Sequence, residues 1–193
     1  MTYIIGIAGI SGAGKSTTAD ILKSELNLPE FTLAHPVKSA CASALGISLE
    51  YFLTIDKKQH LPLIGCTVRE FMQKMGDLLL HQNPYALTSA CGIRITQHKN
   101  QNPNTKGLII SDLRTEAECE WLRNLGDVVF HIKSNTQPLH PHRTEVAPSI
   151  KVGDSIIDNT TGDIDDLHEK VLAIADQIKI LMTDTACNQN TAA

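Results

Sequence analysis

The stretch that decides the fold is YIIGIAGISGAGKST, residues 3–17. Its first part, residues 3–9, is apolar and partly β-branched and leads directly into a cluster of glycines. A continuously apolar strand that ends in a glycine turn is typical of a central parallel strand buried on both faces. Residues 15–27 then repeat apolar side chains at helical spacing, at Ala19, Ile21, Leu22 and Leu26. The stretch therefore predicts a strand, a glycine loop and a helix in succession.

The alternation of strands and helices continues along the chain. Further apolar strands are predicted at 31–34, 108–111, 127–133 and 154–159. Helices are predicted to begin near Pro36, at Thr67, after Asn83, at Thr115 and at Asp163. Two of these starts are capping boxes, Thr67 with Glu70 and Thr115 with Glu118. The pattern predicts an α/β fold with a central parallel sheet of about five strands flanked by helices.

The length of 193 residues and the composition are those of one small domain. We expect that domain over residues 1–182, with a helical insertion at about 36–97 and a flexible tail at 183–193. Residues 134–149 hold three prolines and are expected to form a long functional loop, a lid.

Charge and composition exclude several classes of protein. The 17 basic against 21 acidic residues give a net charge of −4, and only 4% of residues are aromatic, which disfavours binding to a nucleic acid polymer. No stretch could span a bilayer, and the N-terminus shows no secretory leader. Five widely spaced cysteines without a C-x-x-C pair fit neither a disulfide framework nor a zinc site. We therefore expect a cytoplasmic protein.

Residues 9–16, GISGAGKS, match the phosphate-binding pattern G-x-x-x-x-G-K-[ST]. Glycines let backbone N–H groups curl around phosphate oxygens, and the following helix adds its positive amino end. Lys15 is predicted to reach the β- and γ-phosphates of a nucleoside triphosphate, and the Ser16 hydroxyl to ligate Mg²⁺. The donor nucleotide is therefore predicted to lie on Gly12, Ala13, Gly14, Lys15, Ser16 and Thr17. The alternative is a glycine-rich turn that binds nothing.

Other sequence motifs and the chain length narrow the class of phosphate-binding protein. The strings D-x-x-G and N-K-x-D of GTPases do not occur in it, and motor ATPases usually need a longer chain. By analogy of class, a short domain with a polar lid loop indicates a kinase of small phosphorylated acceptors.

Five further segments, read in order, resemble the deoxynucleoside monophosphate kinase family of bacteriophages. They are AHPVK at 34–38, TVREFMQKMG at 67–76, IISDLR at 109–114, HRTE at 142–145 and IDN at 157–159. Together with the glycine loop, the match spans about residues 3–175. Two departures concern Thr115-Glu116-Ala117, where the family often has Asn-Glu, and HQNPYAL at 81–87, where a basic or aromatic segment is expected. The resemblance implies the P-loop nucleoside monophosphate kinase fold, ATP and Mg²⁺ as cofactors, a deoxynucleoside monophosphate as substrate and a homodimer.

The resemblance also implies roles for individual residues. A planar guanidinium group can bind two phosphate oxygens at once, so Arg69, Arg114 and the lid residue Arg143 are expected to bind or bridge the phosphates. Lys15 and Asp112 complete the expected set of catalytic residues. Asp112 would hold Mg²⁺ through water or orient the acceptor. The acceptor would further meet Lys38, Gln73, Asp77, His142 and Glu145, and the donor adenine would meet Asn159 and Gly162.

Plainer interpretations of these residues stay open at this point. Arg69, Lys38 and Asp77 could be solvated charges on helices, and Asp112 could be a helix cap. Arg114 could form a surface ion pair with Glu116 or Glu118. Asn159 and Gly162 could be a simple turn. For the whole protein, the alternatives are another small kinase, of the dephospho-coenzyme A kinase type, or a regulator that binds ATP without catalysis.

Overall fold

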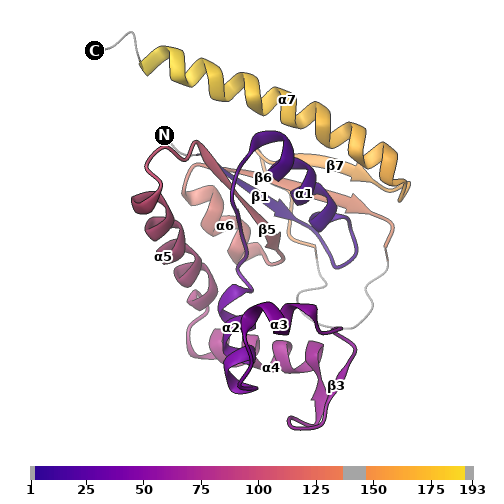
Figure 1. Ribbon diagram of the computed structural model, residues 1–193. Helices are drawn as coiled ribbons and strands as arrows, with labels where there is room; N and C mark the ends of the chain where they lie inside the picture. Colours follow the sequence, from indigo (N-terminus) through magenta and orange to yellow (C-terminus); the bar gives the residue numbers. More distant parts are fainter. Residues whose placement is uncertain (1–2, 137–146, 190–193) are drawn as a thin grey trace. The chain divides into compact units, whose positions relative to one another are not determined.

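The computed structural model describes residues 3–136 and 147–189, with side chains described up to residue 182 (Figure 1). The chain divides into two compact units. The core unit comprises Met1–Phe31 and Gln101–Ala193, and the insert unit comprises Thr32–Asn100. The insert unit is thus a single segment that leaves the core unit after its second strand and returns before its third, close to the segment 36–97 expected as an insertion.

The core unit is built on a five-stranded sheet in the order β2-β5-β1-β6-β7. All four strand pairings are parallel. The strands are β1 (Tyr3–Ala8), β2 (Glu30–Phe31), β5 (Gly107–Leu113), β6 (Val128–Ser134) and β7 (Ser155–Asn159). The central strand β1 is buried along nearly all its length. These findings confirm the predicted α/β class and the parallel sheet of five strands flanked by helices.

Helices cover both faces of this sheet (Figure 1). Helices α1 (Lys15–Leu26) and α7 (Ile164–Gln189) share one apolar core with the sheet residues Ile5, Ile7, Ile109, Phe130, Ile132 and Ile157. Helix α6 (Glu116–Asn124) covers the opposite face. It approaches so closely that a Cβ on Gly6 would lie 2.2 Å from Leu122 Cδ2. Successive side chains of a strand point to opposite faces. Ile5 and Ile7 therefore fill the core that the sheet shares with α1 and α7, and Gly6 leaves room for Leu122 of α6 on the other face.

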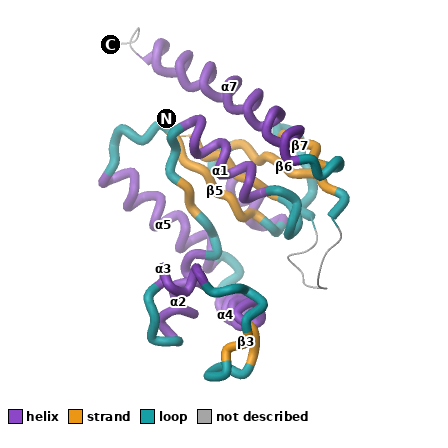
Figure 2. Tube along the Cα trace, turned by 45° about the vertical axis from the view of Figure 1, so that its right-hand side comes forward, coloured by secondary structure: helices purple, strands orange, loops and turns teal. Residues whose placement is uncertain are grey.

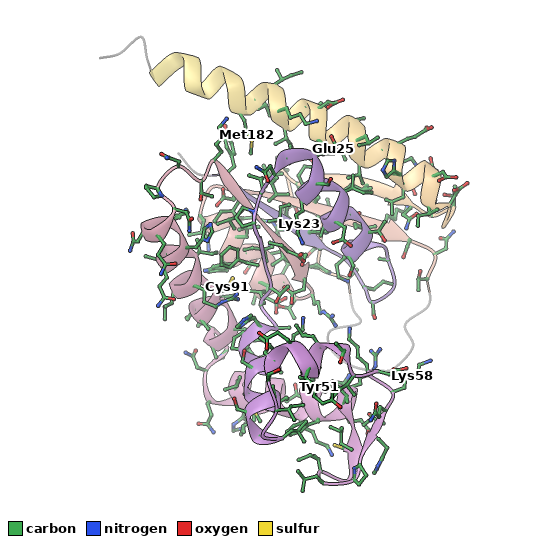
Figure 3. All side chains as sticks on the ribbon, in the orientation of Figure 1. Lys23, Glu25, Tyr51, Lys58, Cys91 and Met182 are labelled. Carbon is green, nitrogen blue, oxygen red and sulfur yellow. The ribbon has the colours of Figure 1, made fainter. Side chains whose placement is uncertain are left out.

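A surface ion pair connects the two helices that share a face. The Lys179 ammonium of α7 lies 2.9 Å from the Glu25 carboxylate of α1. Figure 3 shows Glu25 near the end of α1, below α7. None of the helices in the described part of the chain is long and apolar enough to cross a membrane.

The insert unit is mostly helical (Figure 2). Its elements are α2 (His35–Ala44), α3 (Leu49–Thr54), β3 (His60–Leu61), β4 (Cys66–Thr67), α4 (Val68–Gln82) and α5 (Ala86–Gln101, which ends at the boundary). Strands β3 and β4 form a small antiparallel pair. The predicted capping box at the start of α4 is present, because Thr67 accepts a hydrogen bond from the backbone N–H of Glu70 and the Glu70 carboxylate accepts one from the backbone N–H of Thr67.

Several features differ from the sequence expectation. The edge strand β2 covers Glu30–Phe31 instead of the predicted residues 31–34. The short elements α3, β3 and β4 were not predicted, since none is long enough to show a hydrophobic period. Helix α5 continues to Gln101, into the polar stretch expected as a loop, because polar residues are tolerated on an exposed helix face. Helix α7 continues to Gln189, past residue 182 where the predicted domain ends. A flexible tail at 183–193 remains a prediction.

Candidate active site

The predicted glycine loop connects β1 to α1 over residues 9–14. Gly9, Gly12 and Gly14 have φ angles of 149°, 80° and 107°, a region that L side chains rarely adopt. At Gly14 a Cβ would also lie 2.9 Å from Asn159 Nδ2 and 3.1 Å from Leu167 Cδ2. Conformation and space therefore both demand glycine there, and the strand, loop and helix that the motif requires are all present.

The amino end of α1 is suited to bind an anion. Its N-cap is Gly14, which has no side chain to cap the first N–H groups, and its first turn contains no acidic residue. The uncapped N–H groups and the helix dipole together favour negative charge at this point. Ser16 is exposed on this first turn and Thr17 is half-buried.

Lys15 is held against the loop rather than extended into solvent. Lys15 is only 8% exposed. Its Nζ donates hydrogen bonds to the carbonyl oxygens of Gly9, at 2.7 Å, and Ile10, at 2.6 Å. Burying a cation costs free energy unless it is paired with acceptors. The loop therefore holds one positive charge at the place where the motif predicts phosphate.

Asn159 belongs to the loop structure. It is 9% exposed, and its Nδ2 donates a 2.9 Å hydrogen bond to the carbonyl oxygen of Ala13. Its Oδ1 is buried and has no hydrogen-bond partner within the described part of the chain. Gly162 lies in the following turn with a φ of 69°, and its N–H bonds to the Asn159 carbonyl. Contact of either residue with an adenine remains a prediction.

Asp112 and Arg114 lie at the carboxyl end of β5, the neighbour of β1. In open α/β sheets ligands bind at this edge. Asp112 and Arg114 are both half-buried. Just beyond them, the capping box of α6 is present as predicted, because the Glu118 carboxylate accepts hydrogen bonds from the backbone N–H groups of Arg114 and Thr115. Burial raises the pKa of Glu118 despite these hydrogen bonds.

The surface ion pair considered for Arg114 does not form. Glu116 instead binds Arg123, at 3.1 Å, and Lys151, at 3.0 Å. Glu118 is engaged with backbone N–H groups. Within the described residues, the Arg114 guanidinium makes neither a hydrogen bond nor an ion pair.

In the insert unit, α4 carries Arg69, Gln73 and Asp77 at intervals of four residues, which places them along one side of the helix. Arg69 and Gln73 are half-buried and Asp77 is exposed. Helix α2 packs beside α4, since a Cβ on Gly76 would lie 3.8 Å from Val37 Cγ2. Lys38, the next residue along α2, belongs to the same unit. The Arg69 guanidinium, like that of Arg114, has no partner within the part of the chain that the structure describes.

Two further basic side chains, Arg94 and His35, lie near the start of α2. The Arg94 guanidinium of α5 donates a hydrogen bond of 3.4 Å to the carbonyl oxygen of Thr32. Partial burial and the charges of Arg94 and Lys38 lower the pKa of His35. Sequence reasoning missed Arg94 because it is a lone arginine in a helix with no distinct apolar stripe. His35 lies within the quoted AHPVK segment and could have been singled out.

The lid residues His142, Arg143 and Glu145 lie outside the described residues. The segment that follows them is fixed by a network of ion pairs that the sequence did not reveal. Asp154, whose side chain is 2% exposed, accepts hydrogen bonds from Arg123 Nε at 3.0 Å and Nη2 at 2.6 Å, and its Oδ2 lies 2.8 Å from His131 Nε2. Burial alone would raise the pKa of Asp154, but these hydrogen bonds and one from the Lys151 N–H lower it to about 2.

Glu116 joins this network from the first turn of α6. It accepts hydrogen bonds from the backbone N–H of Ser149, at 2.8 Å, and from the Ser149 hydroxyl. The Ser149 hydroxyl is the largest influence on the pKa of Glu116, which falls to about 2, with Lys151 and Arg123 acting in the same direction. Residues 149–154 are thereby fastened to α6.

Two viral proteins are similar to the chain over nearly its whole length. A protein of Acanthamoeba polyphaga mimivirus, provisionally named deoxynucleotide monophosphate kinase, is 27% identical over 190 residues, covering 90% of this chain and 96% of the relative. The deoxynucleotide monophosphate kinase of Escherichia phage RB69 is 23% identical, covering 87% of this chain and 97% of the relative.

Solved structures resemble the chain more distantly. A crystal structure of a provisionally assigned kinase from Chloroflexus aurantiacus has a TM-score of 0.46 at 14% identity, covering 92% of this chain and 97% of the other. A sugar kinase from Janibacter sp. HTCC2649 has a TM-score of 0.44 at 14% identity, covering 91% and 95%. At such scores neither likeness carries an argument about this chain.

The family model of deoxynucleotide monophosphate kinase matches residues 54–171, more than half of the chain. That range contains Arg69, Asp112 and Arg114 but begins after the glycine loop, so the loop and the family match are separate observations. The chain belongs to the deoxynucleotide monophosphate kinase family and is a phosphotransferase.

Proposed function

We propose that the protein transfers the γ-phosphoryl group of ATP to a deoxynucleoside 5′-monophosphate and so forms the diphosphate. The observation that carries the proposal is the state of Arg69 and Arg114, two half-buried arginines whose guanidinium groups have no partner within the described residues. A planar guanidinium can bind two phosphate oxygens at once. Together with a phosphate-binding loop, two such groups suit a reaction between two phosphorylated substrates.

The donor nucleotide is assigned to the glycine loop. Its β- and γ-phosphates would meet the uncapped amino end of α1 and the ammonium group of Lys15, which is already fixed beside the loop carbonyls. The tight contact of Asn159 with Ala13 and Gly14 would keep the loop in shape while the nucleotide exchanges. The base-binding role of Asn159 and Gly162 remains a prediction.

The residues present also fit Mg²⁺. The hydroxyl of the exposed residue Ser16 and the carboxylate of the half-buried residue Asp112 supply the hard oxygen ligands that Mg²⁺ prefers. One or two protein ligands are enough, because Mg²⁺ in such sites keeps several waters and binds substrate phosphates. When bound, it would neutralise charge on the β- and γ-phosphates. Ser16 and Asp112 are therefore the proposed magnesium residues.

The acceptor is assigned to the insert unit, whose charge suits an anion. It holds seven basic residues, Lys38, Lys57, Lys58, Arg69, Lys74, Arg94 and Lys99, against four acidic ones, Glu50, Asp56, Glu70 and Asp77. Ten basic and seventeen acidic residues remain in the core unit. The acceptor phosphate would bind Arg69 and Lys38, and Gln73 and Asp77 would face its sugar or base. The names of the two viral relatives support a deoxynucleotide as the acceptor.

The proposed chemistry is direct in-line transfer. A phosphate oxygen of the acceptor attacks the γ-phosphorus, the bond from that phosphorus to the β,γ-bridging oxygen breaks, and ADP leaves. Lys15 and Arg114 would stabilise the negative charge on the moving group, and Arg69 would hold the attacking phosphate in line. Contributions from His142, Arg143 and Glu145, like a homodimer and a cytoplasmic location, remain predictions.

A panel of acceptors tests this function. With ATP and Mg²⁺, we expect ADP release to depend on a deoxynucleoside 5′-monophosphate and to be slower with the matching ribonucleotide and with dephospho-coenzyme A. Chromatography should identify the diphosphate as the product. Stronger turnover with dephospho-coenzyme A would assign the protein to another kinase class. ATP binding without turnover on any acceptor would favour a regulator.

A further inference from the structure

The end of β5 departs from regular pairing at the residue that the proposed function assigns to Mg²⁺. Gly6 pairs with Ile110 and Ala8 pairs with Leu113, so the pairing shifts between these two positions. On β5 the two residues Ser111 and Asp112 thus lie opposite the single residue Ile7 of β1, which is a β-bulge. Bulges often occur beside active sites, where they redirect a side chain. Here the bulge contains Asp112 and lies next to the strand that leads into the phosphate loop.

The other residue of the bulge is locked by a hydrogen bond. Ser111 is 7% exposed, and its hydroxyl donates to Oε1 of Glu30, a residue of the edge strand β2. Glu30 is itself fixed by the pairing of β2 with β5, where it lies opposite Ile109. A bulge leaves a residue without backbone pairing in the ladder. The hydrogen bond from the Ser111 side chain therefore holds the strand at a point where backbone hydrogen bonds do not. The Glu30 side chain therefore binds Ser111 of β5, two residues beyond Ile109, the residue with which Glu30 is paired.

The second contact of Glu30 is weaker and more exposed. Its Oε2 lies 3.7 Å from Lys23 Nζ, with the Lys23 side chain 53% exposed and that of Glu30 26% exposed. Figure 3 shows Lys23 on α1. Exposed ion pairs at such distances contribute little to stability. The carboxylate of Glu30 thus has one buried hydrogen bond and one surface contact, which single substitutions can separate.

We propose that Glu30 and Ser111 are positioning residues, whose hydrogen bond fixes the bulge and so holds the Asp112 carboxylate in the place from which it serves the Mg²⁺-bound donor nucleotide. The inference rests on the proposed role of Asp112. Groups that orient a metal-binding residue without touching the metal typically change metal affinity or activity by about 10- to 100-fold when removed. Loss of the hydrogen bond should therefore affect binding of the metal–nucleotide complex and leave metal-free nucleotide binding alone.

Four variants of the full chain separate the hydrogen bond from the ion pair. Ser111→Ala removes the donor, Glu30→Ala removes both contacts, and Glu30→Gln keeps an acceptor oxygen for Ser111 but loses the charge. Lys23→Ala is the matched control, because it removes the surface ion pair and leaves the hydrogen bond. For each variant, calorimetry would give Kd for ATP with Mg²⁺ and with EDTA, thermal unfolding would establish folding, and kinetics would give kcat and KM.

We expect Ser111→Ala and Glu30→Ala to weaken ATP binding in Mg²⁺ by about tenfold and to leave binding in EDTA within about twofold of wild type. A double variant that combines Ser111→Ala with Glu30→Ala should lose no more than either single variant, because both substitutions remove the same hydrogen bond. Glu30→Gln and Lys23→Ala should stay within about twofold of wild type in both conditions. Equal losses with and without Mg²⁺, or a loss in Glu30→Gln as large as in Glu30→Ala, would overturn the proposal.

Asp112→Asn tells a failure of this inference from a failure of the proposed function. If Asp112→Asn weakens binding in Mg²⁺ but Ser111→Ala does not, the positioning role is wrong and the assignment of Asp112 stands. If Asp112→Asn leaves both Kd values and kcat unchanged, the magnesium role of Asp112 is itself wrong.

Discussion

The arginines at the two ends of α6 differ in their interactions. Arg123, in the last turn, binds the buried carboxylate of Asp154 through two nitrogens and also contacts Glu116 and the Ser149 carbonyl. Arg114, just before the first turn, has a guanidinium without a partner in the described part of the chain. Because both side chains are half-buried, exposure does not distinguish them. Their partners do: Arg123 joins α6 to the segment before β7, and Arg114 is the arginine that we propose binds phosphate.

The same contrast extends to the insert unit. Arg69, in the first turn of α4, resembles Arg114 in lacking a partner among the described residues. A cation in the first turn of a helix opposes the helix dipole, so its position there gains nothing for stability. Substitutions at the two kinds of arginine site should therefore separate stability from activity.

Asp154→Ala should cause the greatest loss of stability. Removing one partner of a buried ion pair leaves the other charge uncompensated, so we expect the free energy of unfolding to fall by about 3–5 kcal/mol. Urea denaturation would measure it. The exposed neighbour Asp158 serves as the control, and Asp158→Ala should cost less than about 1 kcal/mol. A similar small loss for Asp154→Ala would mean that the network does not stabilise the core unit.

Arg114→Ala and Arg69→Ala should show the reverse pattern. We expect kcat/KM to fall by about 10²- to 10³-fold, because each removes a group that would bind phosphate in the transition state. The free energy of unfolding should stay within about 0.5 kcal/mol of wild type. Arg69→Ala should act mainly on KM for the acceptor and Arg114→Ala mainly on kcat. Lysine at either position should recover only part of the activity, since it lacks the planar fork.

The Asp154 carboxyl should also give the core unit a dependence on acid. Its pKa in the folded protein is lowered to about 2, from 3.8 for an unperturbed carboxyl. The stabilisation of about 2 kcal/mol that follows from this shift is present above about pH 4 and disappears as the pH falls toward 2. Urea denaturation across this range should show a shallower loss of stability for Asp154→Asn than for wild type. Parallel curves would contradict the assignment.

Lys151→Ala should have the least effect. Lys151 pairs with Glu116 and Glu120 at the surface, with its side chain 45% exposed. Exposed pairs contribute less than about 1 kcal/mol, and salt screens them. The stability difference from wild type should therefore shrink further in about 1 M NaCl. A loss near that of Asp154→Ala would show that the surface pairs, and not the buried carboxylate, stabilise the network.

Several elements of both units could be predicted from local sequence. The apolar run at 3–9 became β1, the glycine motif became the loop, and the capping boxes at Thr67 and Thr115 start α4 and α6. These features depend on neighbouring residues, so periodicity and capping rules suffice to find them.

Other features depend on residues distant in the chain and were not predictable. The pairing of Arg123 with Asp154 joins α6 to the segment before β7 and leaves no local pattern. The bulge at Ser111 and Asp112 exists only through the pairing of β5 with β1, and its lock comes from Glu30 on another strand. Which arginines remain without partners could likewise be learned only from the folded chain.

Product formation by wild type and by Lys15→Ala, with ATP, Mg²⁺ and the best deoxynucleoside monophosphate of the panel, tests the proposed phosphoryl transfer. Wild type should form the diphosphate and ADP in equal amounts, because each transfer converts one ATP to ADP. Lys15 supplies the positive charge that the glycine loop holds in place. Lys15→Ala, at an unchanged thermal midpoint, should form neither above background. Undiminished transfer by a folded Lys15→Ala protein, or no acceptor-dependent product from wild type, would contradict phosphoryl transfer at the glycine loop.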